Sequence, residues 1–142
     1  MFSSNTSYAE KQKYVWFYDI NTGELFKAKA KLIPPIEAPS GPLPDGNPAG
    51  VMAHVFTYND SNGVPKTFIA YLEKMEWKFV RESTDKNLTP EEKIRNWASG
   101  RMIKRPEDVE WFRADSEEAL KIVQLKHLPK SLIYSLKISY PE

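Results

Sequence analysis

The sequence predicts an α+β fold, in which a mostly antiparallel sheet built from β-hairpins packs against two α-helices. Strand-like segments are joined by turns rich in Asn, Asp and Gly, which favours antiparallel hairpins. The helical segments do not alternate with the strands, so the βαβ units of a parallel sheet are not indicated. We expect about five to seven strands, an ordinary size for a sheet.

Length and composition indicate one domain. The chain has 142 residues, of which 41% are hydrophobic and 13% aromatic, enough to form a core without a disulfide or a metal. There is no cysteine, which excludes disulfides, thiolate catalysis and cysteine-based zinc sites. We expect residues 1–13 to be a flexible polar lead-in and residues 14–142 to be a single globular domain.

The first predicted elements are a hairpin and a long loop. Residues 14–29 read as a β-hairpin, because the turn at 19–23 (DINTG) ends in a glycine that tolerates positive φ. Residues 33–50 hold six of the eleven prolines, a density that no regular element tolerates. We therefore expect an ordered, stiff loop that lies along the sheet and is either a recognition element or a structural strap.

The central strands come next. Residues 51–58 and 67–72 are largely apolar on both faces, which is typical of a central pair in a sheet. Residues 73–88 are ambiguous, since Met75, Trp77 and Phe79 alternate like a strand but a polar stretch follows.

Two helices are predicted after this pair. Thr89, Pro90 and Glu92 form a helix start with a capping box, and Gly100 fits the left-handed position at its end. Asp115 is the expected cap of a second helix, which Pro129 ends.

A short hairpin and a last strand complete the predicted fold. Residues 102–103 and 109–112 flank an expected turn at 105–108 and predict a short hairpin, and residues 132–140 alternate like a half-buried strand. The predicted core contains Trp16 or Phe17, Val55, Phe56, Ile69, Leu72, Trp97, Trp111, Ile122, Leu136 and Ile138.

Charge and hydropathy limit the classes of partner. Twenty basic residues against nineteen acidic ones give a net charge of +1, without the basic excess of a nucleic-acid binder. The only basic cluster, Arg101 with Lys104 and Arg105, reads as a solvated hairpin. No apolar run approaches the roughly 20 residues of a membrane helix, and residues 1–13 lack a signal-peptide core. We expect no nucleic acid and no membrane insertion by this chain.

The residues contain no recognisable catalytic motif. His54 reads as a strand histidine in or near the core, and His127 as a residue of the last turn of the second helix. No nucleophile elbow, phosphate loop or dinucleotide fingerprint is present. We expect no cofactor and no metal, and a non-catalytic protein is favoured over an enzyme.

Aromatic residues are the one enriched feature, and they serve either the core or a binding groove. We expect the turn Asp45-Gly46-Asn47 to be exposed next to His54 or Tyr58. The candidate binding residues are Trp16, Tyr18, Asp45, Asn47, His54 and Tyr58.

Two functions are considered. The first is a non-catalytic binding or assembly module whose partner is another protein or a peptide. The second is a small hydrolase or lyase that uses His54 with a nearby carboxylate such as Asp45. The distance between these two side chains discriminates between the hypotheses.

Four segments of the chain stand out as motifs: residues 18–26 (YDINTGELF), 38–51 (APSGPLPDGNPAGV), 53–58 (AHVFTY) and, near the end, 109–116 (VEWFRADS). Through these segments the chain resembles an uncharacterised bacterial protein family. The resemblance implies a hairpin, a Pro/Gly loop and a strand in succession, and it implies no activity. Relatives place the domain after a membrane anchor, which implies an envelope-facing or periplasmic location. No anchor precedes Tyr14 here, and without the resemblance a cytoplasmic location is expected.

Overall fold

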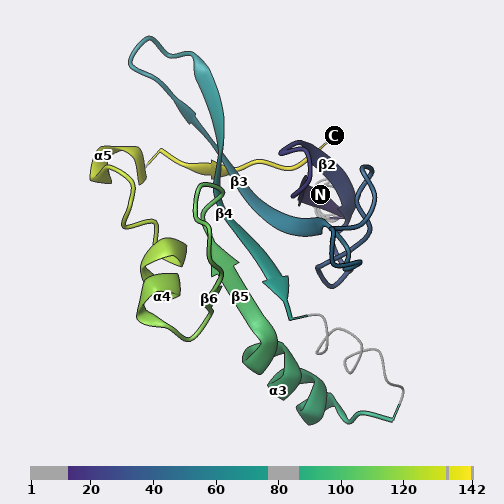
Figure 1. The fold of residues 1–142 in the computed structure, drawn as a ribbon. Helices are drawn as coiled ribbons and strands as arrows, with labels where there is room; N and C mark the ends of the chain where they lie inside the picture. Colours follow the sequence, from purple (N-terminus) through teal and green to yellow (C-terminus); the bar gives the residue numbers. More distant parts are fainter. Residues whose placement is uncertain (1–12, 77–86, 134, 142) are drawn as a thin grey trace, which may run out of the picture.

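The computed structural model describes residues 13–76, 87–133 and 135–141, apart from the side chains of Asn96 and Trp97. These residues form a seven-stranded sheet, in which every pair of strands is antiparallel, and three short helices (Figure 1). The α+β prediction is therefore confirmed, although the helices contribute little of the chain.

The predicted hairpin at 14–29 is confirmed. Strand β1 (Tyr14–Asp19) pairs with β2 (Leu25–Lys29). In the turn, the N–H of Gly23 donates to the carbonyl of Asp19 at 2.7 Å, and Gly23 has a φ of +76°, which a residue without Cβ adopts at little cost.

The centre of the sheet is the long hairpin of β3 (Gly50–Asn59) and β4 (Pro65–Met75). Its tip projects beyond the rest of the fold (Figure 1). On its other edge β3 pairs first with β1, through residues 50–52, and then with β7 (Lys137–Ile138), through residues 56–57. Two strands thus share one edge of β3.

The remaining strands extend the sheet beyond β4. Strand β5 (Arg101–Lys104) pairs with β4, and β6 (Phe112–Arg113) pairs with β5. The predicted short hairpin is confirmed, but its second strand is shorter than expected, and Val109 is 94% exposed.

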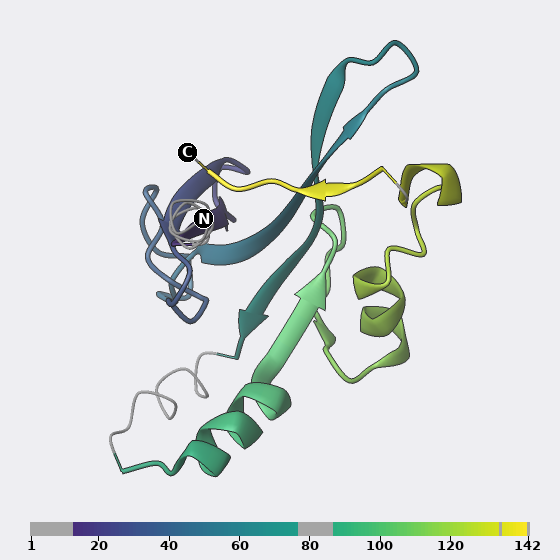
Figure 2. The same cartoon turned by 180° about the vertical axis from the view of Figure 1, so that it is seen from behind.

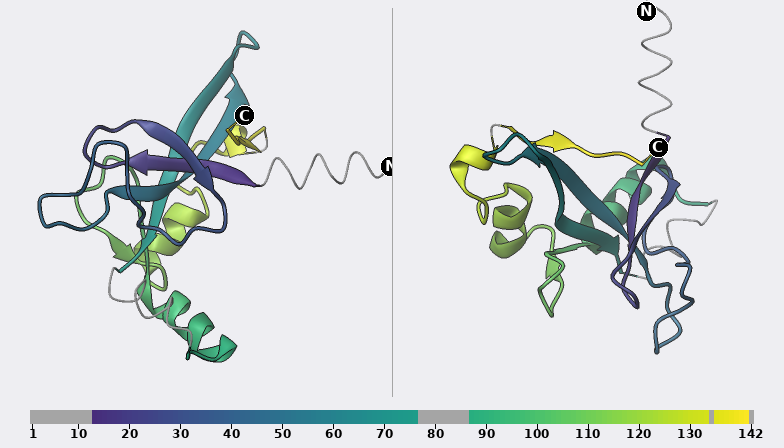
Figure 3. Two further views of the ribbon diagram at one scale, coloured as in Figure 1. Left: turned by 90° about the vertical axis from the view of Figure 1, so that its right-hand side faces the viewer. Right: turned by 90° about the horizontal axis from the view of Figure 1, so that it is seen from above.

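The helices lie around this sheet. Helices α4 (Glu117–Val123) and α5 (Lys130–Ile133) lie on one side of the β3–β4 hairpin, and β1, β2 and the proline-rich loop lie on the other (Figure 3). Helix α3 (Pro90–Gly100) projects away from the sheet (Figure 2). No helix among the described residues is long and apolar enough to span a membrane.

Buried side chains form two clusters on the two faces of β3 and β4. One cluster joins Tyr71 and Ile103 to Ala119 and Ile122 of α4. The other joins Val51, Val55 and Leu72, and β1 packs against it through Trp16 and Tyr18. Because both faces are covered, the central pair is apolar on both sides, as predicted.

The predicted core is correct in part. Phe17, Val55, Leu72 and Ile122 are buried, and Phe56, Ile69 and Leu136 are half-buried. Ile138 is 59% exposed, so its assignment to the core is wrong. The side chain of Trp97 lies outside the described residues. Trp111 is half-buried, with the ammonium groups of Lys74 and Lys104 4.6 Å and 5.4 Å from its ring centre.

Three predicted helix ends are wrong. Gly100 is not left-handed, because the chain passes straight from α3 into β5 and Arg101 is already extended. Ser116, not Asp115, caps α4 and accepts from the N–H of Ala119. This helix ends at Val123, well before Pro129, so His127 lies outside it.

The predicted last strand is also largely wrong. Only residues 137–138 of the expected strand 132–140 pair with the sheet, and residues 130–133 form α5. Alternation alone did not determine the structure here, because the local hydrogen bonds after Pro129 favour a helical turn.

The proline-rich loop makes backbone and side-chain contacts with several parts of the fold. The N–H of Met75 donates to Pro34 and Ile36 bridges to Gly50. Asp19, which is buried, accepts hydrogen bonds from the hydroxyl and the N–H of Ser40 at 2.7 Å and 3.1 Å. Although burial would raise its pKa, these hydrogen bonds hold the pKa of the Asp19 carboxyl below its usual value.

Candidate functional site

Three polar side chains meet in the middle of the sheet. His54 lies on β3, Glu73 on β4 and Arg101 on β5. In an antiparallel sheet residues that face each other across two strands point to the same side. Because His54 is opposite Tyr71 and Met75 is opposite Arg101, the alternation along β4 places Glu73 between the other two.

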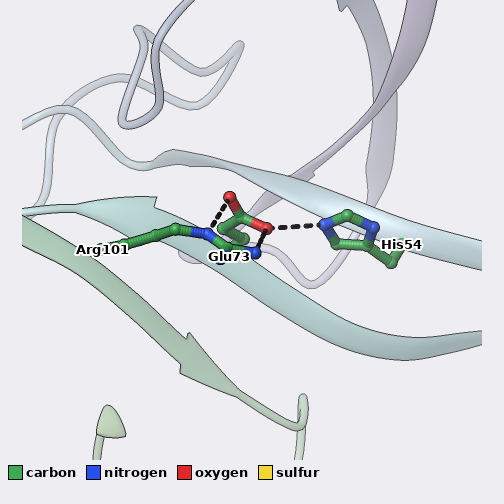
Figure 4. Close-up of polar contacts among 3 residues, drawn as sticks. All are labelled: His54, Glu73 and Arg101. Atoms are coloured by element: carbon green, nitrogen blue, oxygen red, sulfur yellow. Dashed lines mark hydrogen bonds and ion pairs between the residues drawn. The ribbon is translucent and has the colours of Figure 1, made fainter. Parts of the chain in front are cut away.

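Glu73 is held by both neighbours (Figure 4). Arg101 donates from Nε to Oε2 at 2.8 Å and from Nη2 to Oε1 at 3.1 Å, and His54 Nε2 lies 3.0 Å from Oε1. The side chain of Glu73 is only 5% exposed, against 29% for His54 and 32% for Arg101. A bidentate guanidinium contact of this kind fixes the plane of the carboxylate.

The surroundings keep Glu73 ionised. Burial alone would raise the pKa of its carboxyl, but the hydrogen bonds from His54 and Arg101 outweigh burial and lower this pKa from 4.5 to about 2. Burial, helped by the charge of Glu73, raises the pKa of the Tyr71 hydroxyl to about 12. At neutral pH Tyr71 is therefore protonated and Glu73 is a carboxylate.

These charges fix the role of each histidine nitrogen. A carboxylate only accepts hydrogen bonds, so Nε2 of His54 carries the proton that it shares with Glu73. Nδ1 lies on the side of the ring away from Glu73 (Figure 4), and no described residue makes a hydrogen bond to it. The ring is stacked on Tyr71 with centroids 4.1 Å apart, so its orientation is fixed on two sides.

His54 also lines a cavity of about 250 Å³. The cavity lies where β1 leaves the edge of β3 and β7 takes its place, and we name it the fork pocket. Its walls are mainly apolar and aromatic, with His54 and Ser139 as polar groups. The lining residues are Val15, Trp16, Met52, Ala53, His54, Val55, Phe56, Ile138, Ser139 and Tyr140.

The structure brings two of the predicted binding residues together, because Trp16 and His54 line the same pocket. Nε1 of Trp16 is buried and has no hydrogen-bond partner among the described residues. Tyr18 packs beside Trp16 against the cluster of Val51 and Leu72.

The other predicted binding residues lie elsewhere. Tyr58 is on the projecting hairpin and meets Phe68 edge to face, with ring centres 5.8 Å apart. Asp45 is exposed, as predicted, and accepts from the N–H of Asn47 at 2.9 Å. The carboxylate that His54 contacts is Glu73, not Asp45, so the predicted partner of His54 was wrong.

Sequence reasoning missed Glu73 and Arg101. A single acidic residue inside the apolar stretch 68–75 was the available signal, because a buried carboxylate requires a partner. Of the basic residues assigned to a solvated hairpin, Arg101 contacts the buried carboxylate of Glu73. Arg105 pairs with Asp108 at 2.8 Å, and Lys104 donates to the carbonyl of Asp108 at 2.8 Å.

A second hollow, of about 320 Å³, lies between α4 and the turn after β5. Its rim is charged, but Arg105 is paired with Asp108, and Lys121 lies 3.8 Å from Glu117. Within the described part of the chain no three His, Asp or Glu side chains are grouped as a metal site. The fork pocket is therefore the stronger candidate site.

Comparison with protein-family models, with curated proteins and with solved structures gives no match for this chain. The resemblance to a bacterial family through residues 18–26 and 38–58 thus stays a prediction, and function has to be argued from the site.

Proposed function

We propose that this chain is a non-catalytic binding or assembly module, and that the fork pocket is its recognition site. The partner is a protein or a peptide. The location outside the cytoplasm, in a bacterial envelope, is a further part of the proposal and rests on the resemblance alone.

One observation carries the proposal: a mainly apolar pocket is lined in part by a histidine whose ring orientation is fixed by Glu73 and Tyr71. Nε2 of His54 is engaged by Glu73, and Arg101 balances the charge of that carboxylate. The pocket therefore combines mainly apolar walls with two polar residues, His54 and Ser139. Binding sites commonly combine such walls with a few polar groups that set the orientation of the ligand.

The proposal is tested with side-chain analogues in NMR titrations of the whole chain. We expect 4-methylphenol and indole, at millimolar concentration, to shift the methyl signals of Met52 and Ala53. A Ser139→Leu variant fills the pocket and keeps its backbone N–H, so these shifts should fall at least fivefold. Ser135→Leu, at an exposed position outside the pocket, is the matched control and should behave like the unaltered chain. Shifts that are absent, or equal in all three proteins, contradict the proposal.

The alternative function is a small hydrolase or lyase with His54 as the base. The 3.0 Å contact with Glu73 favours it, because a base is commonly oriented by a carboxylate. Against it, Arg101 occupies both oxygens of Glu73. No described hydroxyl makes a hydrogen bond to His54.

The two functions are separated by turnover. General-base catalysis contributes roughly 10²- to 10⁴-fold, so hydrolysis of p-nitrophenyl esters that falls by that factor in His54→Gln would establish the alternative. We expect no such loss.

A further inference from the structure

The C-terminal segment 137–141 covers part of the fork pocket. Lys137 and Ile138 pair with Thr57 and Phe56, and the N–H of Ser139 donates to the carbonyl of Val55 at 2.8 Å. These are contacts between backbones, which any extended chain with a free N–H can make on the edge of a strand.

The side chains of the two residues that pair with β3 contribute little to holding this segment. Lys137 and Ile138 are exposed, and Ile138 keeps 59% of its surface accessible. Of residues 137–141 only Pro141 is buried. Burial of a whole isoleucine side chain stabilises by about 1.5–3 kcal/mol, and most of that is not realised here. The segment can therefore leave β3 without disturbing the pairing of β3 with β4.

The segment also fills its groove incompletely. The cavity of about 250 Å³ remains with Ile138, Ser139 and Tyr140 in place as one of its walls. Ser139 is the smallest of these three side chains. A larger apolar side chain at its place would occupy space that the chain's own segment leaves empty.

We propose that the fork pocket and the adjoining edge of β3 bind an extended peptide of another protein. This peptide adds to β3 as a strand in place of β7 and places an apolar or aromatic side chain beside Trp16 and His54. Segment 137–141 is then the chain's own displaceable occupant. This inference rests on the proposed function, because it requires that the fork pocket binds.

A second copy of this chain is a weaker candidate for the occupant. Its C-terminal segment would make the same backbone contacts and leave the same hollow. Exchange of the C-terminal segments between two copies would add no contact, and it would cost the entropy of association.

The test uses the full chain and fluorescent peptides with the sequence of residues 135–141. A Ser139→Pro variant removes the N–H that reaches Val55 and so frees the edge, whereas Ser139→Ala keeps that N–H and is the matched control. A tethered segment competes at an effective concentration of about a millimolar. We therefore expect the peptide to bind Ser139→Pro at least tenfold tighter than it binds the unaltered chain or Ser139→Ala.

Two peptide variants make the test specific. Ser139→Leu in the peptide should raise its affinity, because the side chain fills the pocket, and N-methylation at Ser139 should abolish binding. Equal binding to all three proteins, or no effect of N-methylation, would overturn the inference. If the side-chain analogues bind and the peptides do not, strand addition is wrong and the binding module stands; if neither binds, the proposed function fails as well.

If the Ser139→Pro variant does not fold, amide exchange in the unaltered chain tests the inference instead. The N–H of Ser139 should exchange at least tenfold faster than that of Leu72 in β4. Equal rates would mean that the segment opens only on global unfolding, and the inference would then be wrong.

Discussion

At the scale of single residues, Glu73 is the centre of a polar arrangement that joins three strands. Three neighbouring strands each contribute one side chain, and the Glu73 carboxylate accepts hydrogen bonds from the guanidinium of Arg101 and the imidazole of His54. Breaking a buried ion pair on one side is costly, because the partner charge loses its compensation in a poor solvent. The arrangement thus connects the register of the sheet to the orientation of His54.

A pH dependence follows from this residue. The pKa of Glu73 is about 2 in the folded chain and ordinarily 4.5, so the stabilisation is complete above pH 4.5 and is lost as the pH falls towards 2. By linkage the loss in the free energy of unfolding is on the order of 3 kcal/mol. Urea unfolding between pH 5 and pH 2 checks this, with Glu73→Gln compared with the exposed Glu110→Gln.

Glu73→Gln should flatten the acid limb of the stability curve, whereas Glu110→Gln should retain it. A direct titration of the Glu73 carboxyl by NMR gives the same information if the variant does not fold. A midpoint near 4.5 would contradict the structure.

His54 could be chosen as a site residue from the sequence, but its partner could not. Asp45 was the acidic candidate considered from the sequence, whereas the pairing of His54 with Tyr71 across the hairpin places Glu73 at the ring. One residue of β4 is extra at the irregularity after His54, where Val55 pairs with Ile69. Such a bulge changes the register and leaves no signal in an alternating apolar sequence.

At the scale of elements, the composition of the proline-rich loop restricts its backbone and predicts the absence of a regular element. The structure adds its attachment points, Ser40 on Asp19 and Asn21 on the carbonyls of Gly41 and Pro42. The C-terminal strand is predicted badly, since its pairing depends on which part of the edge of β3 is left open by β1. The free part of this edge is set by the tertiary structure, and the alternation of residues 132–140 contains no information about it.

Two variants compare a loop residue that is bonded to the rest of the fold with a loop residue that is exposed. Ser40→Ala removes the hydroxyl that donates to the buried Asp19 carboxylate, and it should lower the free energy of unfolding by about 1.5–3 kcal/mol. Asp45→Ala alters an exposed turn and should change the free energy of unfolding by less than about 0.5 kcal/mol. Chemical unfolding of both variants measures the difference. Equal effects would mean that the loop is not fixed through Asp19.

At the scale of the whole molecule, stability is concentrated where both faces of β3 and β4 are covered. The cluster with Ile122 lies on one face and the cluster with Leu72 on the other. Helix α3 has no share in either cluster among the described residues, and Ile94 is 68% exposed. The predicted sheet with two packed helices is therefore right in class, but only α4 contributes buried side chains to these clusters.

Two isoleucines test this distribution, because the same substitution should lower the stability much more on α4 than on α3. Ile122→Ala leaves a cavity between α4 and the sheet and should cost about 2–5 kcal/mol. Ile94→Ala removes a side chain that water already reaches, and should cost less than about 0.5 kcal/mol. Thermal unfolding gives both values, and amide exchange should be slowest at Val55 and Leu72 and fast throughout α3. A large loss of stability in Ile94→Ala would show that α3 packs against the fold in solution, and this division of the molecule would then be wrong.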